Sequence, residues 1–218
     1  KKQKVLTGYF GGHIFSQSFP FLFSSGFFMF TSDDDCRHPW GKTRDGRRHH
    51  LAHHCADVAA CFELLVRLPV VRARLERVAG RKLTETDLSR LAVLAFLHDC
   101  GKLHPGFQAK GWPAGAWPGP LHGHVREGAA IFLARDAPFK GRVAEHLRLA
   151  DLAAWGVGRD LLLAVLAHHG RPFSVNDTGE PRNWRTVEAT GYDPLAASAE
   201  MGACLRDWFA PAFVDDGD

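Results

Sequence analysis

The sequence predicts an all-α fold, and three observations favour this class. Apolar residues recur at helical spacing from residue 49 onward, helix caps and stops flank those runs, and no segment shows a convincing strand-like alternation. With 218 residues, 45% apolar and 23% charged, the chain can bury a core and fits one ordinary domain. The formal net charge of +3 is too small to indicate a function by itself, although a local basic face is compatible with it.

The first half of the chain predicts three helices. The first spans residues 49–68 and is expected to end near Pro69, since proline interrupts helical hydrogen bonding. A short arginine-rich helix follows it. Thr84 is a good N-cap for the third helix, which continues to His98, and Gly101 is expected to stop it.

The second half predicts a long loop followed by further helices. Residues 103–120 contain four prolines and are interpreted as an ordered loop. For its Trp112 and Trp117, packing in the core is favoured over stacking on unpaired bases. The remaining expected elements are helices at 121–135, 142–155 and 159–169, a loop at 171–192, and a last helix from Pro194 to Phe209.

Residues 1–35 differ in kind from the remainder, residues 36–218, which carry the functional domain. Eight of the 16 phenylalanines lie in the first 30 residues. Two interpretations stay open: a tail or docking strand of this domain, or a foreign segment with Met29 as the natural start. Polar residues interrupt the apolar run, which argues against a signal peptide and a membrane span. Five cysteines without Cys-x-x-Cys spacing favour a reducing cytoplasm.

The 13 histidines suggest metal or acid–base chemistry. His98 follows Leu94 by four residues, which places it on the buried face of its predicted helix beside Asp99. A buried imidazole next to a carboxylate needs a partner for each polar atom, and a divalent ion supplies one. A lone buried histidine is more often structural, but clustering reverses that expectation. The clusters are His53-His54, His98-Asp99, His122-Gly123-His124 and His168-His169.

The motif His98-Asp99-x-Gly101-Lys102 resembles the signature of the HD phosphohydrolase superfamily. Further elements stand around it in the order of one branch of that superfamily. They are Trp40-Gly41-Lys42-Thr43, His54-x-x-Asp57-Val58-Ala59, Phe107-Gln108-x-Lys110, His124-x-x-x-Gly128-Ala129 and His168-His169-Gly170. Together they look like the HD nuclease domain of the type I CRISPR helicase-nuclease, over about residues 39–171.

The resemblance implies an HD-domain helical bundle with a metal centre in its core. One ion would be held by His54, His98 and Asp99. A second would be held by Asp99, His124, His168 and His169, with Asp99 as a catalytic bridge. Lys102 would be the second catalytic residue, near the scissile phosphate. The histidine-rich set favours one or two Mn, Fe, Co or Ni ions over Mg, and such ions activate water for attack on phosphorus.

The resemblance also implies a substrate and partners. The substrate would be single-stranded DNA, and the partner a CRISPR effector complex. No Gly-x-x-x-x-Gly-Lys-[Ser/Thr] motif occurs, so the helicase motor is expected in a longer chain or in trans. Either a DNA-contacting surface or a solvated basic loop would account for the four cations Lys42, Arg44, Arg47 and Arg48.

Two alternative functions stay open. One is a phosphohydrolase that acts on nucleotides or phosphomonoesters, and the other is a metal-poor docking module. The family pattern contains a further aspartate, before a tryptophan and after the His-His motif. Asp207 precedes Trp208 but lacks the small residue expected before it, so it is a weak candidate ligand. The competing expectation is a domain truncated at its C-terminal end, before that motif.

Overall fold

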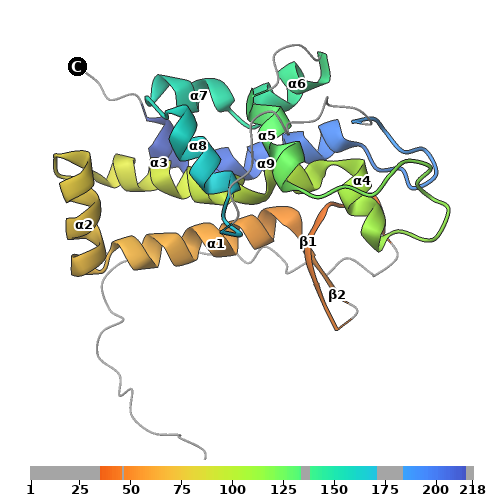
Figure 1. Cartoon of the computed structure of the whole chain (residues 1–218), viewed down its shortest axis with the longest axis horizontal. Coiled ribbons are helices and arrows are strands. Elements are labelled where there is room, and N and C mark those ends of the chain that lie inside the picture. Colours follow the sequence, from red (N-terminus) through yellow and green to blue (C-terminus); the bar gives the residue numbers. More distant parts are fainter. Residues whose placement is uncertain (1–34, 46, 134–137, 171–183, 215–218) are drawn as a thin grey trace, which may run out of the picture.

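The computed structural model describes residues 35–45, 47–133, 138–170 and 184–214, and its elements are shown in Figure 1. The Phe-rich segment up to residue 34, helix positions 134–135 and loop positions 171–183 lie outside these residues. In chain order the elements are β1 (Trp40–Arg44), β2 (Arg47–His50), α1 (Leu51–Val66), α2 (Pro69–Ala79), α3 (Glu85–Phe96), η1 (Leu97–Leu103), α4 (Pro105–Gln108), η2 (Ala109–Gly111), α5 (Val125–Leu133), α6 (Pro138–His146), α7 (Leu149–Ala154), α8 (Arg159–Leu166), α9 (Pro194–Trp208) and η4 (Ala210–Phe213), where η marks a 3-10 helix.

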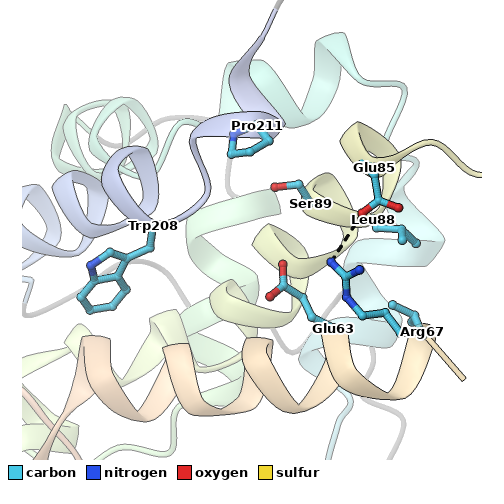
Figure 2. Close-up of a pocket in the computed structure, with 8 residues that line it drawn as sticks. Glu63, Arg67, Glu85, Leu88, Ser89, Trp208 and Pro211 are labelled. Carbon is cyan, nitrogen blue, oxygen red and sulfur yellow. Dashed lines mark hydrogen bonds and ion pairs between the residues drawn. The ribbon is translucent and has the colours of Figure 1, made fainter. Parts of the chain in front are cut away.

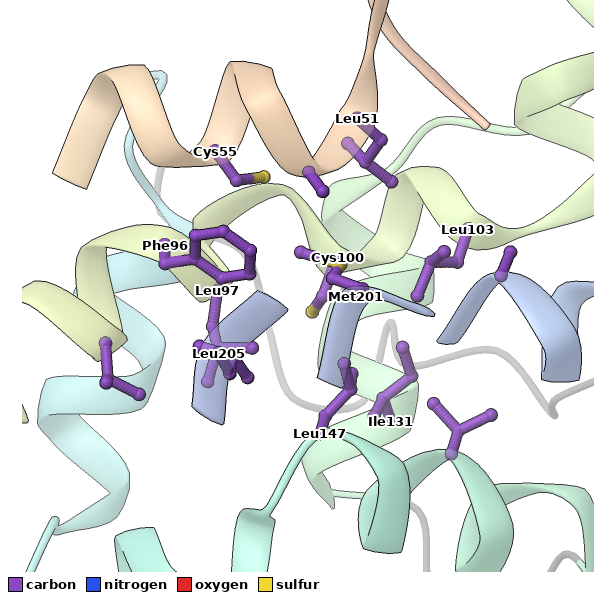
Figure 3. Close-up of a cluster of buried hydrophobic side chains, with 14 of the residues drawn as sticks. Leu51, Cys55, Phe96, Leu97, Cys100, Leu103, Ile131, Leu147, Met201 and Leu205 are labelled. Carbon is purple, nitrogen blue, oxygen red and sulfur yellow. The ribbon is translucent and has the colours of Figure 1, made fainter. Parts of the chain in front are cut away.

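The described part of the chain is mostly helical, which confirms the predicted class. Helices α1 and α3 pack along each other, and α2 joins them at one end (Figure 1). Side chains from α1, α3, η1, α5 and α9 fill the space between the helices (Figure 3). Leu51, Phe96 and Leu205 are completely buried there, and each such burial stabilises the fold by about 2 kcal/mol.

Local capping explains where the early helices begin. Thr84 and Asp87 form a reciprocal capping box at the start of α3: the Asp87 N–H donates to Thr84 Oγ1 at 3.1 Å. The predicted N-cap at Thr84 is therefore confirmed. Helix α1 begins after His50, whose Nδ1 accepts from the Ala52 N–H at 3.3 Å. Helix α2 begins at Pro69, which suits a first helical position because its missing N–H is not needed there.

The expectation that the fold holds no strand is wrong for residues 40–50. Strands β1 and β2 pair antiparallel, with Thr43 opposite Arg48. The sequence of the hairpin lacks the apolar–polar alternation that predicts a strand, because charged residues occupy both of its faces. Gln108 holds it to the bundle: its Oε1 accepts from the Trp40 N–H at 2.9 Å, and its Nε2 donates to the Trp40 carbonyl at 3.0 Å.

Gly101 does not stop α3 as expected. The α-helix ends at Phe96, and the His98-Asp99 motif lies in η1, which continues past Gly101 to Leu103. A Cβ on Gly101 would lie 1.9 Å from the His124 carbonyl oxygen. Glycine is required here because two segments meet backbone to backbone, so this residue sets the distance between η1 and the start of α5.

The expected long loop at 103–120 contains the short helices α4 and η2. His104 caps α4, because its Nδ1 accepts from the Gly106 N–H at 2.9 Å, and Pro105 occupies the first helical position. The prediction that the tryptophans pack in the core is confirmed for Trp112, which is buried. Trp117 is half-buried against it, with ring centres 6.4 Å apart.

The single helix expected at 142–155 is two helices, α6 and α7. The chain turns at Arg148, which adopts a positive φ of 60°. The carbonyl of His146 lies so close to Gly202 of α9 that a Cβ there would approach it to 2.0 Å. Helix α6 therefore ends where it meets α9. Within the residues described, no helix has the length and apolar character needed to cross a membrane.

Candidate metal centre

Asp99 lies at the centre of the histidine clusters. It is 2% exposed and sits at a kink inside η1, where φ is −110° and ψ is 15°. Its Oδ2 lies 3.0 Å from His54 Nε2 and 3.1 Å from His98 Nε2. Its Oδ1 lies 3.1 Å from His124 Nε2 and 3.5 Å from His168 Nε2. The two oxygens of one carboxylate therefore face two separate imidazole pairs.

Four segments far apart in sequence position these side chains. His54 comes from α1, His98 from η1, His124 from the residue before α5, and His168 and His169 from the turn after α8. Helix α5 begins at residue 125 rather than 121, and α8 ends at residue 166 rather than 169. His124, His168 and His169 therefore lie just outside these helices.

The second histidine group converges on one point. His124 Nε2 lies 3.4 Å from His168 Nε2 and 3.0 Å from His169 Nε2. Three ring nitrogens this close cannot all be satisfied by hydrogen bonds among themselves, since a neutral imidazole carries one donor and one acceptor. A cation among them removes the conflict.

The proton positions of two histidines support the same conclusion. His98 Nδ1 lies 2.8 Å from the Ala95 carbonyl oxygen, and His168 Nδ1 lies 3.2 Å from that of Val165. A carbonyl only accepts, so each Nδ1 carries the proton, and in the neutral form of each ring the Nε2 lone pair faces Asp99. Lone pairs facing carboxylate oxygens repel unless a cation lies between them.

These residues fit a divalent transition-metal ion. Asp99 Oδ1 is buried and has no hydrogen-bond donor among the described residues. Nitrogens and oxygens about 3 Å apart have the spacing of neighbouring ligands around an ion at about 2.1 Å from each. The triads His54–His98–Asp99 and His124–His168–His169 each keep their ligand atoms within 4.8 Å of one another.

The protonation states also suit metal binding. Burial raises the pKa of Asp99, but the surrounding His54, His98 and Lys102 side chains outweigh burial and keep the pKa well below its usual range. Burial lowers the pKa of His124 to about 4, although Asp99 opposes this shift. An ionised carboxylate and neutral imidazoles are the forms that bind metals.

Lys102 brings a positive charge to the same carboxylate. Its Nζ donates to Asp99 Oδ2 at 2.7 Å and to the Gly41 carbonyl at 2.6 Å. Gly41 is the second residue of β1, and a Cβ there would lie 2.7 Å from the Cβ of His54. The hairpin therefore packs directly on the centre, and Lys102 links the two.

A family model described as "Cas3, HD domain" matches residues 40–218. The chain belongs to the Cas3 HD domain family. No curated protein and no solved structure matches it. Membership implies a hydrolase of the nuclease type that binds divalent metals, and a role with CRISPR complexes and DNA. All the clustered histidines and Asp99 lie inside the matched residues.

Other predicted residues of this Cas3 HD domain lie outside the centre. Asp207 is exposed on α9 and belongs to none of the metal-capable groups among the described residues. Three of the four predicted basic residues are exposed on the hairpin, namely Lys42, Arg44 and Arg47. The fourth, Arg48, is half-buried and donates to the Gly111 carbonyl.

Sequence reasoning missed a second histidine–carboxylate cluster. It consists of His104, His122 and Glu127, with His122 Nδ1 2.9 Å from one Glu127 oxygen and His104 Nε2 3.8 Å from the other. The available signal was His104 directly before Pro105, the pattern of a helix N-cap. A similar group of His38, His50 and Glu200 lies near the start of α1.

A hollow between α1, α3 and the C-terminal segment contains none of the clustered histidines (Figure 2). An ion pair between Arg67 and Glu85, 3.4 Å apart, borders it. Trp208 and Leu88 contribute apolar surface, and burial raises the pKa of Glu63. None of the residues that line this hollow is a proposed ligand of the Asp99 centre.

Proposed function

We propose that this Cas3 HD domain hydrolyses phosphodiester bonds of single-stranded DNA during type I CRISPR interference. The observation that carries the proposal is the buried Asp99 carboxylate, which turns one oxygen toward each of two imidazole groups and lies 2.7 Å from the ammonium of Lys102. A bridging carboxylate with an adjacent cation is suited to neutralising charge on a reacting phosphate.

The proposed ligands follow from this arrangement. His54, His98 and Asp99 would hold one ion, and Asp99 would share a second with the group His124, His168 and His169. Because most ligands are imidazole nitrogens, Mn, Fe, Co or Ni is favoured over Mg, which prefers oxygen. When bound, such ions lower the pKa of water and so supply a nucleophile near neutral pH.

Residues of the chain prepare the site for a phosphate. Asp99 stays ionised because its neighbours stabilise the charged form. Lys102 uses two of its three N–H donors on Asp99 and Gly41, which leaves one for a non-bridging phosphate oxygen. The Gly41 carbonyl thus orients the ammonium toward the reacting group.

The hairpin beside the centre supports a polynucleotide substrate. Lys42, Arg44 and Arg47 are exposed on strands that pack against His54 through Gly41. A row of exposed cations next to the scissile position can track a phosphate backbone. We propose the CRISPR effector complex and a helicase, in a longer chain or in trans, as the partners that deliver the strand.

A metal-reconstitution assay tests the proposal. The purified chain is loaded with Mn, Co or Ni, its metal content is measured, and it is offered single-stranded DNA, double-stranded DNA and nucleotides. We expect cleavage of single-stranded DNA that is lost in Asp99→Ala. Nucleotide turnover without DNA cleavage would replace the proposal with a phosphohydrolase, and bound metal below one ion per chain would favour a docking module.

A further inference from the structure

Lys110 is a cation beside the metal centre to which the proposed chemistry assigns no role. It is exposed on η2, and its Nζ lies 4.4 Å from the centre of the Phe107 ring. The Nζ of Lys102 lies 5.5 Å from the centre of the same ring. The negative face of an aromatic ring attracts cations, so Phe107 holds both ammonium groups in one neighbourhood.

Phe107 also connects this pair to the metal centre. The ring is 7% exposed, and its centre lies 5.6 Å from the ring of His124. It is too buried to stack on a base, so its contribution is to space the lysines relative to His124.

The two lysines differ in their partners. Lys102 is paired with Asp99, whereas no carboxylate pairs with Lys110 among the residues that the structure describes. Burial, and then the positive charge of Lys102, lower the pKa of Lys110. An anion that lies near both ammonium groups relieves the repulsion between them. At the edge of a phosphodiesterase centre, the fitting anion is a phosphate.

The turn that carries Lys110 is held on both sides. Gln108, two residues earlier, makes paired hydrogen bonds with the Trp40 backbone at 2.9 and 3.0 Å. Gly111 lies so close to the Trp40 indole that a Cβ would approach its Nε1 to 2.8 Å, and the Gly111 carbonyl accepts from Arg48. A backbone fixed in this way lowers the entropy lost when the lysine contacts a ligand.

We propose that Lys110 binds the phosphate next to the scissile one, while Lys102 serves the scissile phosphate itself. The inference rests on the proposed function and adds to it a residue that binds a second phosphate of the substrate. A polynucleotide, with phosphates in succession, engages both lysines, whereas a diester with a single phosphate engages only Lys102. The domain therefore prefers chains of nucleotides over small phosphodiesters.

Two substrates separate the roles of the lysines. The manganese-loaded chain and its Lys110→Met variant are assayed on a 20-nucleotide oligothymidylate and on bis(4-nitrophenyl) phosphate. We expect kcat/KM on the oligonucleotide to fall about tenfold, mostly through KM, because one charge-assisted contact is lost. This loss should exceed the loss on the small diester by about fivefold. Lys110→Arg should restore oligonucleotide cleavage.

Lys82→Met is the matched control. Lys82 is an exposed lysine on the connection between α2 and α3, and it pairs with Glu76 of α2. This variant should leave both reactions unchanged. Equal losses on the two substrates in Lys110→Met, or no loss on either, would overturn the inference and leave the nuclease proposal standing. A wild-type chain that binds manganese and cleaves neither substrate would overturn both.

Discussion

Two histidine–carboxylate clusters lie near the start of α5: the Asp99 centre, and the buried cluster of His104, His122 and Glu127. One histidine of each, His98 and His104, carries its proton on the opposite ring nitrogen. In the Asp99 centre, His98 Nδ1 donates to the Ala95 carbonyl at 2.8 Å, which leaves the Nε2 lone pair for a metal. In the buried cluster, His104 Nδ1 accepts from the Gly106 N–H at 2.9 Å, so Nε2 carries the proton and faces Glu127 as a donor. Residue type alone does not distinguish a ligand from a hydrogen-bonding partner.

The position of each histidine at a helix end explains the difference. The last carbonyls of a helix and its first N–H groups lack partners inside the helix. His98 and His168 follow the last turns of α3 and α8, and their Nδ1 atoms donate to carbonyls three residues earlier. His50 and His104 are N-caps, and their Nδ1 atoms accept N–H groups two residues later. For these four histidines, the helix end beside which each one lies thus sets which ring nitrogen carries the proton.

Among the variants that test this comparison, Asp99→Asn is expected to have the largest effect. The amide retains the shape of the side chain but removes the charge shared by both imidazole groups. We expect both bound ions to be weakened and cleavage to fall on the order of a thousandfold, the upper range for one electrostatic group. Metal analysis after gel filtration and a single-stranded DNA assay measure the two effects. Asp160→Asn, an exposed substitution on α8, is the matched control and should change neither.

The second test concerns the spacing between the clusters. In Gly101→Ala, the added Cβ would lie 1.9 Å from the His124 carbonyl oxygen and 2.4 Å from the Gly128 nitrogen. Helix α5 must shift, which we expect to cost about 2 kcal/mol of stability and to reduce activity by about tenfold to a hundredfold. Urea unfolding and the DNA assay measure both.

Gly123→Ala is the control, because a Cβ there has no atom within 4 Å although it adjoins His124. A Gly101→Ala chain with wild-type activity would show that the position of His124 does not depend on the close contact with η1.

Much of this arrangement could be predicted from the sequence. Helical periodicity and capping residues gave the class and most helices, and the His-Asp motif with its neighbours singled out residues that the fold brings together around Asp99. The hairpin was missed because Gln108, 68 residues from Trp40, holds it in place. Its one local signal is Asp45 followed by glycine, a common hairpin turn. The proton positions could not be predicted, because they depend on which backbone group meets each Nδ1.

Glu127→Gln tests the buried side of the comparison. Burial raises the pKa of Glu127, while the charge and hydrogen bond of His122 and a hydrogen bond with Trp184 oppose the shift. Because His104 presents a donor, we expect the variant to keep its full metal content and to lose about 1–2 kcal/mol of stability. Thermal unfolding of the metal-loaded chain measures the second effect. Glu145→Gln, exposed on α6, should have no effect, and loss of an ion in Glu127→Gln would make the buried cluster a metal site.

The smallest expected effect concerns the surroundings of the Asp99 centre, which adjoins the basic hairpin where Gly41 packs on His54. The double variant Lys42→Ala, Arg44→Ala removes two exposed cations that are not among the proposed metal ligands. We expect single-stranded DNA to bind about threefold to tenfold more weakly at low salt, with the difference shrinking as salt rises, because phosphate contacts release counterions. Fluorescence anisotropy of a labelled oligonucleotide across a salt series measures this slope. A second double variant, Arg74→Ala, Arg77→Ala on α2, changes the net charge equally and should leave the slope unchanged. Equal weakening by both pairs would mean that DNA responds to overall charge, and the hairpin would then be a solvated loop with no part in guiding the strand to Asp99.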